Sequence, residues 1–254
     1  MSKDITPILE GWDHDPDELQ VRLVVGDDGR EKLQVRLDLG LFQMELDGRP
    51  DGRRPSGRES LLDLHEARAR ERGDDYTLDE ADCVALMREG VQYYHRYIAL
   101  FQIRRYDLVD RDTTRNLRLF AFVVAHAPRE SDRLQFDQYR PYVTLIRARA
   151  LALQAMDRED HRAALGFIDD GIAGLRAFLR DYDRQDHEDE MPELTFLTSW
   201  RAEIDRARPV GPAERLEQQL ARAVAAEEFE EAARLRDQLR RLRDAEAGAP
   251  SRPS

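Results

Sequence analysis

The chain has little of several features that would assign it to a class of protein. A single cysteine, Cys83, among 254 residues excludes an internal disulfide and a zinc site built from several cysteines. Only two of the 40 basic residues are lysines, Lys3 and Lys32, which leaves little room for lysine chemistry. No apolar run approaches the roughly 18 residues of a membrane span. The start of the chain also lacks the apolar stretch of a signal peptide, so we expect a cytoplasmic protein without membrane contact.

The motifs of familiar active sites are absent as well. The chain has no P-loop, dinucleotide-binding, zinc-protease or nucleophile-elbow pattern. Asp13, Asp15 and Asp17 imitate the start of a calcium loop, but Glu18 stands where such a loop requires glycine. The sequence therefore predicts no metal site, no cofactor and no enzymatic activity.

Two chemically versatile side chains lie on one apolar helical segment. His95 follows Tyr93 and Tyr94, and an enzyme of unrecognised type would have to bring it together with a carboxylate. The sequence offers no such partner, so we interpret His95 as a packing residue. Cys83 is interpreted in the same way, as a small buried hydrophobe.

One loop is rich in arginine. A net charge of −12 argues against a protein that coats DNA, although a local basic patch is compatible with it. Residues 47–58 are dense in Gly, Pro and Arg, and their glycines could place four arginines around an anion: Arg49, Arg53, Arg54 and Arg58. A solvated linker is the simpler interpretation, because charged loops are ordinary.

The N-terminal part of the chain predicts strands. Residues 19–25 and 33–39 alternate apolar and polar side chains, and Gly26 and Gly29 between them suit a hairpin turn. Residues 41–46 either form a third strand or prolong the second. A two-stranded ribbon is marginal alone, so we expect it to pack on the helices that follow.

The middle of the chain predicts helices. One runs from Ser60 to Gly73, and the capping-box spacing of Thr77–Glu80 opens the longest apolar helix. Further helices are predicted over 113–127 and 193–207. The longest helix has an apolar stripe that we expect to be buried, made of Val84, Met87, Val91, Tyr94, Ile98 and Phe101.

Residues 138–180 predict a helical hairpin similar to one tetratricopeptide (TPR) unit. Its small residues fall where two helices would approach closely: Ala152, Ala155, Ala164 and Gly171. The predicted fold class is α+β and predominantly α, with a β-hairpin packed on a helical domain over 1–207. A linker over 208–212 follows.

The last predicted element is a second helical hairpin over 213–243, followed by a disordered tail over 244–254. Its seven arginines balance seven acids, and its apolar stripes are too small to hold two short helices together alone. The run "EFEEAARLRDQLRRL" is similar to the UVR motif, the hairpin shared by the excinuclease subunits UvrB and UvrC. The motif also occurs in certain Clp-type ATPases and McsA-type kinase activators. Glu227 departs from the pattern, which often has leucine there.

The resemblance implies docking, since UVR hairpins associate head to head. It places Phe229 and Leu239 as core anchors of such a pair. The implied partner-binding residues are Leu216, Leu220, Phe229, Glu230, Ala233, Arg236, Asp237, Leu239 and Leu242. The helicase, nuclease, ATPase and paired-cysteine signatures of those relatives are missing from the rest of the chain.

We therefore expect a non-enzymatic adaptor or scaffold that binds another UVR protein or a second copy of itself. The alternative is an accessory factor of nucleotide excision repair that touches DNA through the arginine loop, which we do not favour.

Overall fold

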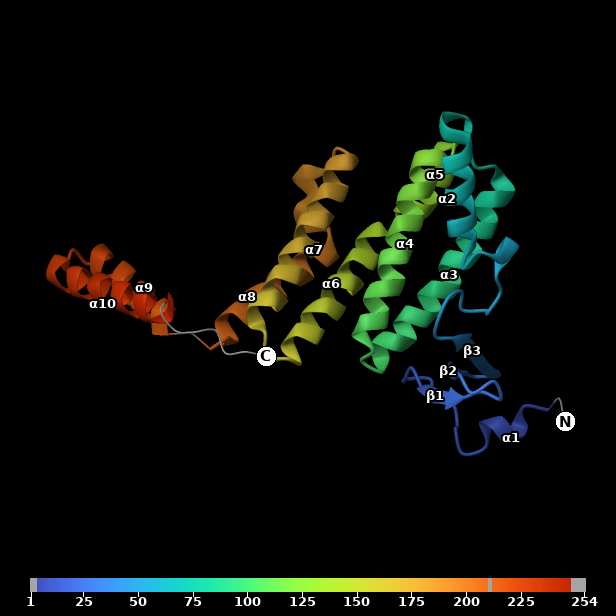
Figure 1. The fold of residues 1–254 in the computed structure, drawn as a ribbon, viewed down its shortest axis with the longest axis horizontal. Helices are drawn as coiled ribbons and strands as arrows, with labels where there is room; N and C mark the ends of the chain where they lie inside the picture. The colour runs from blue at the N-terminus through green and yellow to red at the C-terminus, as the bar shows by residue number, and fades with distance from the viewer. Residues whose placement is uncertain (1–3, 210–211, 248–254) are drawn as a thin grey trace. The chain divides into compact units, whose positions relative to one another are not determined.

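The computed structural model describes residues 4–209 and 212–247, which form ten α-helices and a three-stranded sheet (Figure 1). The architecture is α+β and predominantly helical, as the sequence predicts. The chain divides into two units, of which the first ends at Asp205 and the second begins at Arg206.

The sheet is antiparallel with the strand order β1 (Val21–Val25), β2 (Glu31–Leu37) and β3 (Gly40–Glu45). The predicted hairpin is confirmed, and residues 41–46 belong to a third strand rather than to a longer second one. A turn at 38–39 sets Leu37 opposite Gly40, and Leu33 then pairs with Met44. Leu33 and Met44 are buried, so this face of the sheet joins the main core.

Short helices flank the sheet and lead into the helical part. Helix α1 (Thr6–Leu9) precedes β1, and α2 (Leu61–Arg72) begins after Ser60, whose hydroxyl accepts a hydrogen bond from the Asp63 amide. Gly73 ends α2 with a φ of +62°, a conformation that favours glycine. Three 3₁₀ turns connect the larger elements: η1 (Pro55–Gly57), η2 (Gly73–Asp75) and η3 (Gln185–Glu190).

Helix α3 (Glu80–Gln102) begins with a different cap from the predicted one. Its N-cap is Asp79 rather than Thr77. The Asp79 carboxylate accepts a hydrogen bond from the Asp82 amide at 2.8 Å, and the Asp82 carboxylate accepts one from the Asp79 amide. The capping-box spacing was therefore assigned two residues too early, because aspartate caps a helix as well as threonine does.

The predicted apolar stripe of α3 is only partly buried: Met87, Ile98 and Phe101 pack half-buried against the main core. Val84 and Val91 of the predicted stripe are 46% and 44% exposed, whereas Glu89 and Arg96 are buried. The expectation failed because it counted only apolar residues. The charged residues of the true buried face are neutralised by partners on α4 (Tyr106–His126).

A buried ion pair joins α3 to α4. The Arg96 Nε and Nη2 atoms donate to the two carboxylate oxygens of Asp112 at 2.6 and 2.8 Å, and both side chains are 1% exposed. The Nη1 atom donates to the carbonyl oxygens of Glu45 and Gly48 at 2.8 and 2.9 Å. One guanidinium therefore connects both helices to the end of β3.

A second buried carboxylate holds the start of α2. Glu89 is fully buried and accepts from the amides of Leu61 and Leu62 at 2.7 and 3.2 Å. Arg115 of α4 pairs with the same carboxylate. A negative charge at this position satisfies unpaired amides and complements the helix dipole, so Glu89 fixes α2 against α3.

Three further helices follow: α5 (Glu130–Asp137), α6 (Arg140–Met156) and α7 (His161–Asp181). Helices α6 and α7 form the predicted hairpin, antiparallel because Gly171 faces Ala148 while Gly174 faces Thr144. A Cβ atom on Gly171 would lie 2.6 Å from that of Ala148, so the close approach requires glycine. The predicted small residues of this pair are all buried.

Helix α8 (Pro192–Ala207) closes the first unit and buries Leu194, Leu197 and Ile204. In the second unit, α9 (Pro212–Ala225) and α10 (Phe229–Ala247) form the predicted C-terminal hairpin. Helix α10 extends past residue 243, so the first four residues of the predicted tail are helical. Residues 248–254 of that tail, and 210–211 of the predicted linker, lie outside the described residues.

Arg96→Met is expected to lower the free energy of unfolding by about 3–5 kcal/mol, because it leaves the Asp112 carboxylate buried without a partner. The double variant Arg96→Met/Asp112→Leu removes both charges and should recover part of that loss. Urea unfolding followed by circular dichroism measures both variants. Arg176→Met breaks the exposed pair with Glu188 and serves as the matched control, with little change expected. A double variant less stable than the single one would contradict this account.

Candidate functional site

The C-terminal hairpin has a small interior of its own. Ala223, Ala232 and Leu235 are buried, and Leu216 and Leu220 pack half-buried against them. Two helices with so small a core bury too little surface to be stable in isolation. We therefore expect further contacts to complete this hairpin.

The end of the hairpin at its bend exposes apolar side chains. Val224, in the last turn of α9, is 53% exposed, and Phe229, the first residue of α10, is 69% exposed. The resemblance implies that Phe229 is a core anchor of a hairpin pair, and in the single chain its ring is open to solvent. Glutamates surround it, and Glu227 in the bend adopts a φ of +58°.

The other predicted partner-binding residues divide into two groups. Leu239 is buried and Leu242 is half-buried, like Leu216 and Leu220. Glu230, Ala233 and Arg236 are exposed, and Arg236 lies 3.3 Å from the partly exposed Asp237. An exposed pair of this kind contributes little to stability, so both charges remain available to a partner.

The structure gives the arginines of the 47–58 loop different environments. Arg49 has a side chain only 13% exposed, 2.9 Å from Asp51 and 3.3 Å from the buried Glu89. Arg53 is 83% exposed and 4.0 Å from the same Asp51. Arg54 and Arg58 are also exposed. Arg49 therefore stabilises the fold, because the anions it contacts are carboxylates of this chain rather than an external ligand.

The side chains singled out for chemistry lie among apolar groups. The His95 ring packs 5.0 Å from the ring of Phe42, and burial lowers the pKa of its imidazole. Burial raises the pKa of the Cys83 thiol to about 11, so the reactive thiolate is scarce at neutral pH.

A buried histidine on α2, His65, is not predicted from the sequence. Its Nδ1 lies 2.6 Å from the Tyr76 hydroxyl, and its Nε2 lies 3.7 Å from the Asp82 carboxylate. Burial lowers the pKa of His65, which favours the neutral ring. No sequence signal pointed to this contact, because its members come from three separate segments.

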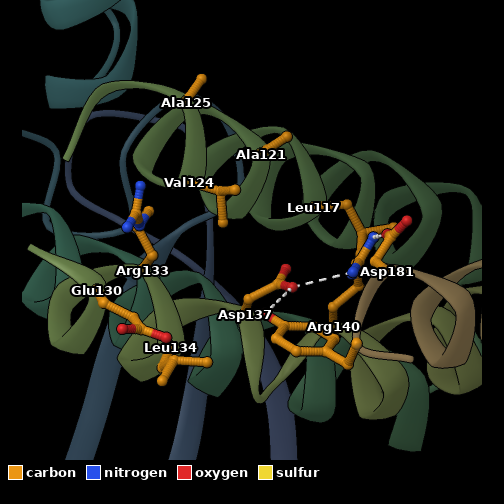
Figure 2. Close-up of a pocket in the computed structure, with 11 residues that line it drawn as sticks. Leu117, Ala121, Val124, Ala125, Glu130, Arg133, Leu134, Asp137, Arg140 and Asp181 are labelled. Atoms are coloured by element: carbon orange, nitrogen blue, oxygen red, sulfur yellow. Dashed lines mark hydrogen bonds and ion pairs between the residues drawn. The ribbon is translucent and has the colours of Figure 1, made fainter. Parts of the chain in front are cut away.

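A groove of about 550 Å³ lies between α4, α5 and the facing ends of α6 and α7 (Figure 2). Its apolar side is α4, with Leu117, Ala121 and Val124. At one end Asp137 accepts from Arg140 at 2.9 Å and from the Tyr182 hydroxyl at 2.7 Å. Those charged groups tie the helices together, so we assign the groove no ligand.

Two kinds of site are not found within residues 4–209 and 212–247. No group of three or more His, Cys, Asp or Glu residues in these ranges could hold a metal ion. Over the same ranges, no helix combines the length and the apolar character needed to cross a bilayer.

Comparison with protein families matches residues 212–245 to the UvrB/uvrC motif, UVR. The match spans α9 and most of α10 and confirms the motif that the C-terminal sequence predicts. UVR motifs are associated with UvrB and UvrC, and so with DNA repair or protein interaction. Searches of curated proteins and of solved structures gave no match.

Arg49→Ala is expected to lower the free energy of unfolding by about 1–3 kcal/mol, because it removes one of the charged partners of the buried Glu89. Arg53→Ala, in the same loop but solvent-exposed, should leave stability unchanged. Thermal unfolding of the two variants side by side makes the comparison. Equal stability of both would show that Arg49 does not support the fold.

Stability should also depend on pH through the buried histidines. His65 and His95 both have lowered pKa values in the folded chain, whereas an unfolded histidine titrates near about 6.5. As the pH falls below about 6.5, histidines of the unfolded chain become protonated while His65 and His95 of the folded chain stay neutral. The unfolded state is therefore favoured, and the free energy of unfolding decreases. Urea unfolding at about pH 7.5 and about pH 5.5 measures this loss of stability. The free energy of unfolding of His95→Phe should decrease less between the two pH values than that of the wild type. An identical decrease in both proteins would exclude a contribution from His95.

Proposed function

We propose that this chain is a protein–protein adaptor without catalytic activity, and that its C-terminal hairpin docks onto a second UVR hairpin. The second hairpin belongs either to another UVR protein or to another copy of this chain. The observation that carries the proposal is Phe229, an aromatic side chain exposed at the end of a hairpin whose own core is small.

The chemistry of the bend supports a docking role. Aromatic anchors provide much of the energy of protein interfaces, and Phe229 is a large apolar side chain exposed among charged neighbours. Glu230 lies beside Phe229, and Arg236 and Asp237 follow further along the same helix. Charges at such positions select a partner more than they add affinity.

The first unit supports binding rather than catalysis. Two of its buried carboxylates are paired within the chain: Asp112 with Arg96, and Glu89 with Arg115. His95, the candidate base, packs against rings rather than against a carboxylate. The two ion pairs hold helices of this unit together, which supports a scaffold role for it.

The DNA-contact alternative remains second. The net charge of −12 opposes it, and Arg49 of the predicted anion-binding loop is engaged with Glu89. Only the exposed Arg53, Arg54 and Arg58 would then contact phosphate.

Phe229→Asp is expected to abolish docking and leave the fold intact, because the exposed ring contributes to a partner contact rather than to the core. Self-association is measured by sedimentation of the purified chain, and capture of UVR-motif proteins by mass spectrometry of what the immobilised chain retains. Val25→Asp is the matched control, since Val25 is 71% exposed on β1 and the variant should bind as the wild type does. Unchanged binding by Phe229→Asp, with the hairpin still helical, would refute docking through this residue.

A further inference from the structure

A cavity of about 360 Å³ opens between α3, α4 and α6, apart from the groove of Figure 2. Val91 and Tyr139 stand at its mouth, 44% and 49% exposed, whereas Phe120 and Val143 of its wall are buried. Its volume lies in the range of small-molecule sites. The predicted apolar stripe of α3 supplies part of this wall through Met87, Val91 and Tyr94.

The wall is aromatic and its rings differ in orientation. Tyr94 meets Tyr97 edge-on, at 5.6 Å between ring centroids and an interplanar angle of 90°. Tyr142 of α6 lies 6.4 Å from Tyr94 at 51°. Rings set at such angles offer both faces and edges to a flat molecule that packs against them.

Tyr97 is the most deeply buried tyrosine of the cavity lining. Tyr97 is 1% exposed and lines the cavity, and none of the described residues forms a hydrogen bond with its hydroxyl. Burial, with Tyr142 and Tyr94 close by, raises the pKa of Tyr97, so the hydroxyl keeps its proton. A protonated hydroxyl can donate a hydrogen bond to an acceptor placed in the cavity, and a ligand without an acceptor cannot use it.

The lining side chains that the structure describes carry no charge near neutral pH. Burial lowers the pKa of His95, and the other polar members are tyrosines and Asn116. The Asn116 amide is already engaged, since it donates to the Gly90 carbonyl and accepts from Arg115. A charged ligand would therefore lose its hydration without gaining a counter-ion.

We propose that this cavity binds an uncharged, flat aromatic compound that carries a hydrogen-bond acceptor such as a carbonyl oxygen. Its rings lie among Tyr94, Tyr97 and Tyr142, and the acceptor receives the Tyr97 hydroxyl proton in a hydrogen bond. This would give the helical unit a ligand of its own, independent of docking by the hairpin.

Calorimetric titration of the full chain with four probes of one ring system tests the proposal. Naphthamide is neutral with an acceptor, methylnaphthalene is neutral without one, naphthoate is an anion, and naphthylmethyl-trimethylammonium is a cation. Naphthamide should bind tightest, by at least about tenfold over either ion. Tyr97→Phe should weaken naphthamide about fivefold and leave methylnaphthalene unchanged, because it removes only the hydroxyl.

Two further variants complete the test. Val91→Trp places a large ring at the exposed mouth and should abolish binding of all four probes. Tyr106→Phe alters a buried tyrosine outside the cavity and should bind as the wild type does. Binding that survives Val91→Trp, or no binding of naphthamide by the wild type, would overturn the proposed site. Tightest binding of the cation or the anion would overturn the assignment of an uncharged ligand.

Discussion

The buried pair of Arg96 and Asp112 is the interaction on which the first unit depends. Each charge is almost completely removed from water, so each is tolerable only while the other is present. The same guanidinium also satisfies the Glu45 and Gly48 carbonyl oxygens, at the end of β3 and just beyond it. The sheet, α3 and α4 are therefore constrained together: none of them can move away without exposing an unpaired charge or an unsatisfied carbonyl.

Glu89 extends this constraint to α2 and to the loop before it. It receives the amides at the start of α2, and Arg115 and Arg49 neutralise its charge from two other segments. These buried charged groups of the first unit therefore hold its helices and loops in place. The two sites proposed for binding are apolar: the tyrosine-lined cavity beside α3, and separately the exposed Phe229 of the hairpin.

These two proposed binding sites differ in kind. The cavity is enclosed by three helices of one unit and suits a small molecule, because its polar groups are few and uncharged. Phe229 lies on a short hairpin ringed by charges, an arrangement that suits a protein surface. A chain with both would couple a scaffold that holds a ligand to a module that recruits a partner.

The sequence by itself determined the local elements of this protein. Ser60 and Gly73 mark the two ends of α2, and small residues mark the close approach of α6 and α7. The order of residues in 213–243 identifies the UVR hairpin. These signals are readable because each involves residues that are neighbours along one helix or turn. Only the tertiary structure decided which face of α3 is buried and that Arg49 belongs to the interior. Arg96 contacts Asp112 16 residues away and Glu45 51 residues away, and Glu89 reaches back 28 residues to Leu61. In a sequence, a charged residue that is buried against such a distant partner cannot be told from a surface residue. Hydrophobic periodicity depends on the polarity of each residue and contains no information about which residues pair.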